Sequence, residues 1–173
     1  EANPFEANPA EGKEITIVYE DDVLLVINKP SEFLSVPGKR IQDSVYQRIK
    51  DMYPEATGPL IVHRLDMSTS GLLLIAKDEE TYVKLQSQFI KRTIKKRYVA
   101  LLDGVLKEKE GFIDLPLRVD LDDRPRQLVC YEHGKQARTN WEVIEVKNNQ
   151  TRVYFYPISG RTHQLRVHAS HEM

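Results

Sequence analysis

The sequence has little of three things, and each shortage excludes a class of protein. Its 173 residues include one cysteine, Cys130, so an internal disulfide is excluded and a reducing, cytoplasmic location is expected. No apolar run approaches the roughly 20 residues that a membrane helix needs. The acidic, proline-containing start also has no hydrophobic stretch of the kind found in a secretory signal. We therefore expect no membrane partner.

The chain also has almost no net charge, only −1, which by itself disfavours a nucleic-acid partner. The charge is uneven, however, because residues 1–22 hold seven acids and one base, leaving an excess of five positive charges in residues 23–173. Residues 91–97, KRTIKKR, hold five bases in seven positions. This run is typical of a solvated surface or of a phosphate-contacting patch, and composition alone leaves both open.

The hydropathy pattern predicts many strands and few helices. Helices are expected after Asp43 and Asp78, which can cap them, and from residues 159–160 onward. Hairpins outnumber strand–helix–strand crossovers, so we predict an α+β fold with a mostly antiparallel sheet flanked by helices and loops. Residues 1–14 are predicted to be a flexible acidic lead-in and residues 15–173 a single domain. Strands are predicted at 15–19, 23–27, 60–62, 72–76, 98–102, 111–115, 127–131, 137–146 and 151–157.

Two polar constellations could carry chemistry. Residues 63–71, HRLDMSTSG, lie between two apolar strands, and their composition alone fits either a site or a hydrogen-bonded turn. Residues 159–168, SGRTHQLRVH, place two arginines and two histidines at a predicted helix start, which favours an anion. The histidines are five apart, which is not the spacing of a helical metal pair. We predict no metal site and expect both histidines to be packed and hydrogen-bonded.

These segments resemble a known family. His-Arg-Leu-Asp at 63–66 with Thr-Ser-Gly at 69–71 is similar to the signature of the RluA-type pseudouridine synthases. Further stretches agree in the family's order: Asn-Lys-Pro at 28–30, Lys-Arg-Tyr-Val-Ala at 96–100, and Gly-Arg-Thr-His-Gln-Leu-Arg-Val-His at 160–168. The resemblance spans roughly residues 15–169 and implies the pseudouridine synthase fold, with residues 15–173 as its catalytic domain. The related RsuA-type enzymes usually carry Gly where this chain has His63, which argues against membership of that branch.

The resemblance implies a role for four residues. Asp66 matches the aspartate that acts covalently on the target uridine, and Arg161 matches the basic residue that pairs with it. Tyr98 matches the tyrosine that packs on the uracil, and Arg64 the arginine beside the flipped base. The family's reaction isomerises uridine to pseudouridine. It breaks the N1–C1′ bond, turns the base and joins C5 to C1′, so neither metal nor redox cofactor is required. A nearby guanidinium would favour the ionised carboxylate, and an aromatic ring would hold the everted base.

Three short segments resemble the compact branch of the family named for RluA: residues 35–38, 124–127 and 129–135. Members of this branch modify 23S ribosomal RNA and tRNA anticodon stem-loops. We therefore expect RNA as the partner, a monomer, and no protein partner. Family members continue beyond residue 173, so part of the C-terminal region is expected to be missing. The alternative is a non-catalytic RNA-binding module that keeps the fold. A glycosidase-like hydrolase is disfavoured, because such enzymes use two facing carboxylates and the Asp66 motif offers one.

Overall fold

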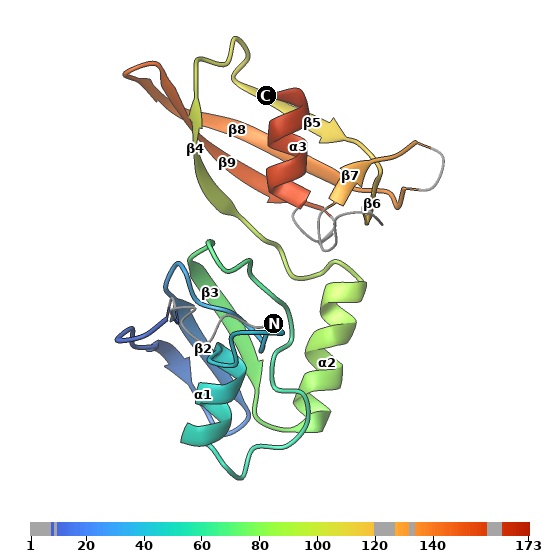
Figure 1. Cartoon of the computed structure of the whole chain (residues 1–173). Helices are drawn as coiled ribbons and strands as arrows, with labels where there is room; N and C mark the ends of the chain where they lie inside the picture. Colours follow the sequence, from blue (N-terminus) through green and yellow to red (C-terminus); the bar gives the residue numbers. More distant parts are fainter. Residues whose placement is uncertain (1–7, 9, 120–126, 132–133, 159–163) are drawn as a thin grey trace. The chain divides into compact units, whose positions relative to one another are not determined.

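The computed structural model describes residue 8 and residues 10–119, 127–131, 134–158 and 164–173. The chain forms two compact units, Glu1–Lys91 and Arg92–Met173. Figure 1 shows the elements of each unit along the chain. That residues 15–173 form one catalytic domain stays a prediction.

The first unit is built on a three-stranded antiparallel sheet. Its strands are β1 (Thr16–Glu20), β2 (Leu24–Lys29) and β3 (Gly71–Ala76), with β2 in the centre. The helices are α1 (Val45–Met52) and α2 (Glu79–Ile90), and α2 packs against β3. Alternate residues of β2 and β3 point to one face, as the pleat requires, and form the core with α1 and the loop that precedes it. The fully buried members are Leu25, Ile27, Leu73, Ile75, Val45, Ile49 and Phe33.

The two helices of this unit begin at side-chain caps. Asp78 caps α2 as predicted, because its carboxylate accepts a hydrogen bond from the Thr81 amide at 2.7 Å. The prediction that Asp43 caps α1 is wrong: Ser44 is the cap and accepts from the Gln47 amide at 3.1 Å. Asp43 is instead held by Arg48, five residues further on.

The predicted strand over residues 60–62 is also not formed. Leu60 follows a proline and has a φ of 64°, which is the left-handed region and interrupts an extended backbone. The segment meets β3 at a single antiparallel bridge, Ile61 to Ile75. The Ala76 amide donates to the Leu60 carbonyl at 2.9 Å, so the segment still lies along the edge of β3.

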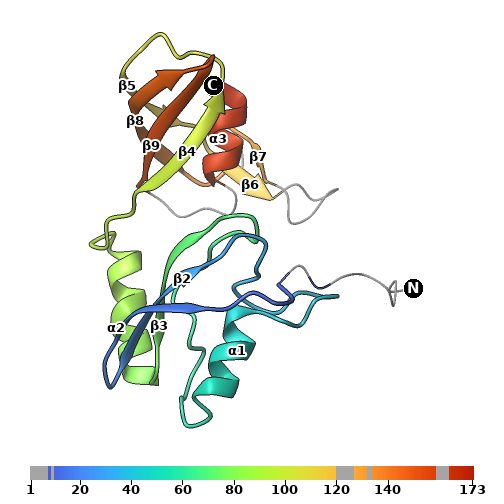
Figure 2. The ribbon, with the colours of Figure 1, turned by 90° about the vertical axis from the view of Figure 1, so that its left-hand side faces the viewer.

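The second unit contains a four-stranded antiparallel sheet in the order β4-β9-β8-β5 and a small β6-β7 ribbon. The large sheet comprises β4 (Tyr98–Asp103), β5 (Glu110–Asp114), β8 (Arg138–Lys147) and β9 (Gln150–Pro157). The ribbon pairs β6 (Leu117–Val119) with β7 (Gln127–Val129). Helix α3 (Gln164–Glu172) lies against one face of the large sheet, as Figure 2 shows.

The core of this unit lies between that sheet face and α3. Thr151, Val153 and Phe155 alternate along β9 and are buried. His168 is fully buried, and its ring nitrogens lie 3.0 Å from the Thr139 hydroxyl and 2.9 Å from the Leu115 carbonyl. The expectation of a packed, hydrogen-bonded residue is therefore confirmed for His168, whereas His163 lies outside the described residues.

The predicted α+β class is confirmed, with antiparallel sheets and three helices among the described residues. The strand β6 was not predicted, and residues 159–160, where the last helix was expected to open, lie outside the described ones. Among the residues that the structure describes, no helix is long and apolar enough to cross a membrane. In the described part of the lead-in, the Asn8 side chain contacts Asp43, just before α1, and the Ala10 carbonyl contacts Arg48 of α1.

Candidate active site

Asp66 lies in a loop that joins Val62 to β3, which we call the Asp66 loop (residues 62–70). Its centre is a tight turn, in which the Thr69 amide donates to the Asp66 carbonyl at 3.0 Å. The loop enters β3 through Gly71, whose φ of 134° is open to glycine and strained for other residues. The glycine of the Thr-Ser-Gly motif is therefore explained by the backbone, and the Asp66 side chain is half-buried.

Lys29, the last residue of β2, supports this loop from within the unit. Its side chain is fully buried, and its ammonium group donates to the main-chain carbonyls of Phe33 at 2.6 Å, Met67 at 3.1 Å and Pro30 at 3.1 Å. The Met67 carbonyl also accepts from the Phe33 amide at 3.1 Å. The residue that follows Asp66 is thus fixed by two donors.

The surroundings of Lys29 lower the pKa of its ammonium group. Burial lowers the pKa of this lysine from 10.5 to about 8, against the attraction of Glu32 and then Asp66, which raise it. An ammonium group that is buried and satisfied by three carbonyls forms a fixed electrostatic support for the loop.

Two serines hold the loop on either side of Asp66. The buried Ser35 hydroxyl donates to the Leu65 carbonyl at 2.9 Å and accepts from the Leu65 amide at 3.1 Å. The Ser31 hydroxyl donates to the Ser68 carbonyl at 2.9 Å. The main chain is therefore fixed at residues 65, 67 and 68, which limits how far the Asp66 carboxylate can move.

The start of the loop is attached to α2 and β3. The His63 ring stacks on Phe89 with centroids 4.8 Å apart, and its Nε2 accepts from the Leu74 amide at 3.0 Å. The Gln86 side chain donates to the Val62 carbonyl at 2.9 Å. The neutral His63 ring therefore carries its proton on Nδ1, and its role here is to join the loop to its neighbours.

The four residues predicted for the site are distributed over both units. Arg64 is exposed and Asp66 half-buried in the same loop of the first unit. Tyr98 is half-buried at the start of β4 in the second unit, where it pairs with Phe155 on the sheet face that carries the core. Arg161 lies outside the described residues. A shared pocket of Asp66, Tyr98 and Arg161 stays a prediction.

The basic run continues into the second unit. The Arg97 guanidinium lies over the Tyr154 ring, 4.3 Å from its centroid. Burial lowers the pKa of Lys96, and the like charge of Arg92 lowers it further. Among the described residues, no group of three or more histidine, cysteine, aspartate or glutamate side chains could hold a metal ion.

The sequence reasoning gave no role to Lys29, Ser35 or Phe33. A signal for Lys29 was present, because residues 25, 27 and 29 alternate along β2 and a lysine at the third position points to the core. The serine and phenylalanine act through main-chain contacts over about 30 positions, and no local pattern reports such contacts.

The known proteins that this chain resembles are RNA pseudouridine synthases. The family model described as RNA pseudouridylate synthase matches residues 23–171. The chain is 48% identical over 164 residues to the dual-specificity RNA pseudouridine synthase RluA of Escherichia coli, covering 93% of this chain and 74% of the relative. Its counterpart in Haemophilus ducreyi is 49% identical over 158 residues, covering 88% of this chain and 70% of the relative.

Two solved structures are similar over most of the chain. Human RNA pseudouridylate synthase domain containing 1 superposes with a TM-score of 0.75 at 28% identity, over 91% of this chain. Human RNA pseudouridylate synthase domain containing 4 gives a TM-score of 0.74 at 26% identity, also over 91% of this chain. The chain spans 65% and 64% of those two proteins, just under two thirds of each.

Proposed function

This chain belongs to the RNA pseudouridylate synthase family and is an RNA pseudouridine synthase, an isomerase, and on that premise we propose that Asp66 is its catalytic carboxylate. The observation that supports the proposal is the way the Asp66 loop is built. Four hydrogen bonds from the Lys29, Ser31 and Ser35 side chains and the Phe33 amide fix the main chain directly before and after this one aspartate. Such fixation is what a nucleophile or base needs, since small misplacements are costly to the rate.

The proposed reaction is an internal exchange of bonds within one nucleotide. The N1–C1′ bond breaks, the uracil turns, and C5 bonds to C1′; the C5 proton then leaves to solvent and N1 takes a proton from it. Asp66 can take part by attacking the ring or the sugar, or by removing a sugar proton. No electron acceptor or outside group enters the balance.

We assign the other residues from the same resemblance. Arg64, exposed on the Asp66 loop, would lie beside the everted base or hold a phosphate of the RNA. Tyr98 would pack on the free uracil, and Arg161 would pair with the Asp66 carboxylate. The proposed substrates are stem-loops in 23S ribosomal RNA, in the tRNA anticodon arm, or in both.

The test is tritium release from C5-labelled uridine in transcripts of these two RNA classes. The full-length wild-type protein should release tritium and the Asp66→Asn variant should release none above background. Asp51→Asn removes an exposed carboxylate of the same kind from α1 and should keep wild-type release. Undiminished release by the Asp66 variant would contradict the assignment of the carboxylate. Salt-sensitive RNA binding by the wild type without any release would favour a non-catalytic RNA-binding module.

A further inference from the structure

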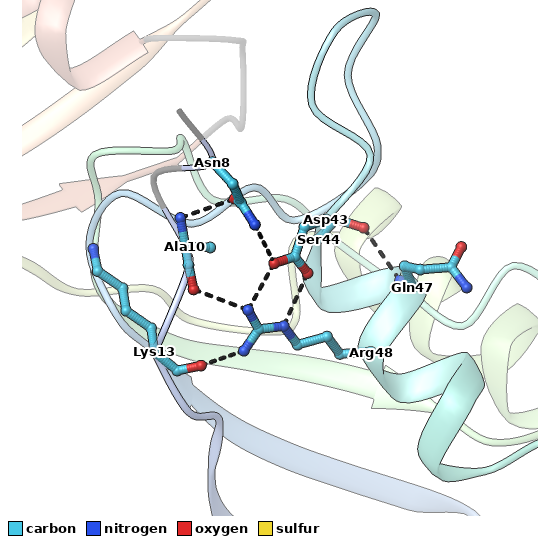
Figure 3. A network of polar contacts seen from close by, with 7 residues as sticks. All are labelled: Asn8, Ala10, Lys13, Asp43, Ser44, Gln47 and Arg48. Atoms are coloured by element: carbon cyan, nitrogen blue, oxygen red, sulfur yellow. Dashed lines mark hydrogen bonds and ion pairs between the residues drawn. The ribbon is translucent and has the colours of Figure 1, made fainter. Parts of the chain in front are cut away.

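The first unit contains a second polar network, centred on Arg48 of α1 (Figure 3). Its guanidinium makes a bidentate pair with Asp43, with Nε to Oδ1 at 2.9 Å and Nη2 to Oδ2 at 2.7 Å. The same group donates to the main-chain carbonyls of Ala10 at 2.9 Å and of Lys13. Because the Arg48 guanidinium donates to it, the pKa of Asp43 is held below its usual value.

The partners of Arg48 near the N-terminus form one segment, which we call the N-terminal strap (Asn8 and residues 10–13). The Asn8 side chain donates to Asp43 at 2.8 Å and accepts from the Ala10 amide at 3.0 Å. The Ala10 side chain is 1% exposed. The strap is therefore held at the start of α1 by the Asn8 side chain, which contacts Asp43, and by the Ala10 and Lys13 carbonyls, which accept from Arg48.

Two routes lead from this network to the Asp66 loop. In the first, the Arg48 guanidinium lies 4.4 Å from the centroid of the buried Phe33 ring, and Phe33 donates its amide to the Met67 carbonyl. In the second, the Lys13 ammonium donates to the Ser31 carbonyl at 2.5 Å, and the Ser31 hydroxyl donates to Ser68. Both routes end on the two residues that directly follow Asp66.

We propose that Arg48 is a positioning residue for the reaction: it anchors the N-terminal strap and, through Phe33 and Ser31, holds the Asp66 loop in its reactive geometry. The inference rests on the proposed role of Asp66. Arg48 acts through other residues, since its fork of donors is occupied by Asp43 and by the strap carbonyls. A planar guanidinium can bind a carboxylate, two carbonyls and a ring face at once, and a lysine cannot do all of this.

The main experiment compares Arg48→Gln with wild type in the full-length protein, on the same RNA transcripts. We expect kcat to fall about tenfold or more while KM stays within about twofold, because the carboxylate is displaced but the RNA contacts remain. Arg48→Lys should fall between the two. Lys84→Gln removes the cation of an exposed pair on α2, Lys84 with Glu80 at 3.0 Å, and serves as the matched control that keeps wild-type kcat.

A purely structural role of Arg48 gives a different result. The Arg48→Gln protein would then melt at a lower temperature but, assayed while folded, would turn over as fast as Lys84→Gln, and that outcome overturns the proposal. Should Arg48→Gln not fold, Arg48→Lys keeps the positive charge but not the planar fork of donors, and its kcat should still fall about threefold or more relative to Lys84→Gln. Unchanged kcat in this variant would equally overturn the proposal.

Amide hydrogen exchange separates this inference from the assignment of Asp66. Peptides covering residues 63–70 should exchange faster in Arg48→Gln than in Lys84→Gln, whether or not the protein forms pseudouridine. Faster exchange in Arg48→Gln, together with absent catalysis in the wild type, would contradict the proposed function but would still support the strap as a structural support of the loop. Equal exchange in the two variants would overturn the role of Arg48 even in an active enzyme.

Discussion

Replacement of Lys29 by methionine tests the electrostatic support of the Asp66 loop. Methionine keeps most of the length and apolar volume of the lysine side chain, but it removes the ammonium group that donates to the carbonyls of Phe33, Met67 and Pro30. At least the Phe33 carbonyl is then left without this partner in a buried place. A buried acceptor that loses its partner costs about 1–3 kcal/mol.

An opposing term comes from burying the charge. The pKa of Lys29 is lowered from 10.5 to about 8, mainly by burial, which corresponds to a penalty on the folded state of at most about 3 kcal/mol at neutral pH. The two terms are similar in size and opposite in sign. We therefore expect Lys29→Met to change the free energy of unfolding at pH 7 by no more than about 2 kcal/mol.

The pH dependence gives the sharper test. Between pH 8 and 10.5 the folded protein has released the Lys29 proton and the unfolded chain still holds it. The unfolded state then binds more protons, so the free energy of unfolding contributed by this group rises with pH. Wild type should gain up to about 3 kcal/mol over Lys29→Met across this window, since the other titrating groups are shared by both proteins.

Urea unfolding of both proteins at intervals from pH 7 to 10.5 measures this difference. Because Asp66 raises the pKa of Lys29, the gain should begin at a lower pH when the comparison is repeated in an Asp66→Asn background. A difference between the two proteins that stays constant with pH, or that moves against wild type, would refute the idea of a buried, charged lysine beneath the loop.

Two further substitutions probe each unit separately. Ser35→Ala removes the hydroxyl that both donates to and accepts from Leu65, and should lower the free energy of unfolding by about 1–3 kcal/mol in urea titrations; an unchanged midpoint would contradict the buried reciprocal bond. Gly111→Ala would place its Cβ 2.7 Å from the Trp141 ring and should cost about 1–3 kcal/mol, seen as a lower melting temperature; a neutral result would mean that the ring moves aside without loss.

Local patterns were sufficient to predict most of the fold. The β-branched runs that became β1, β2 and β9, and the Asp78 cap of α2, depend on interactions between residues close in sequence. Asp43 shows where such reasoning fails. An aspartate before a helix suits a cap, but Arg48 binds its carboxylate and Ser44 takes over the cap.

The candidate site, like the fold, was predicted in part: its motifs could be read from the sequence, and its long-range contacts could not. The Asp66 motif and the Asn-Lys-Pro motif that contains Lys29 were recognised from the sequence. The contacts by which Lys29, Ser35 and Phe33 support the loop were not, because these residues reach it from positions 30 to 38 residues earlier. The strap was expected to be flexible from its acidic, proline-containing composition. Its contacts are made with Arg48, Asp43 and Ser31, which lie 18 to 38 residues further along the chain, and composition carries no information about such partners. The flexibility of the whole lead-in stays a prediction.

The segment before the Asp66 loop also shields a strand edge. β3 pairs with β2 on one side only within its sheet, and on its other side the amides of Leu74 and Ala76 are taken by His63 and Leu60. An uncovered edge of this kind is a template on which another chain can add a strand and begin to aggregate. Residues 60–63 therefore occupy the edge of β3 on which such intermolecular pairing would begin, and the histidine of the motif covers part of that edge as well as holding the loop.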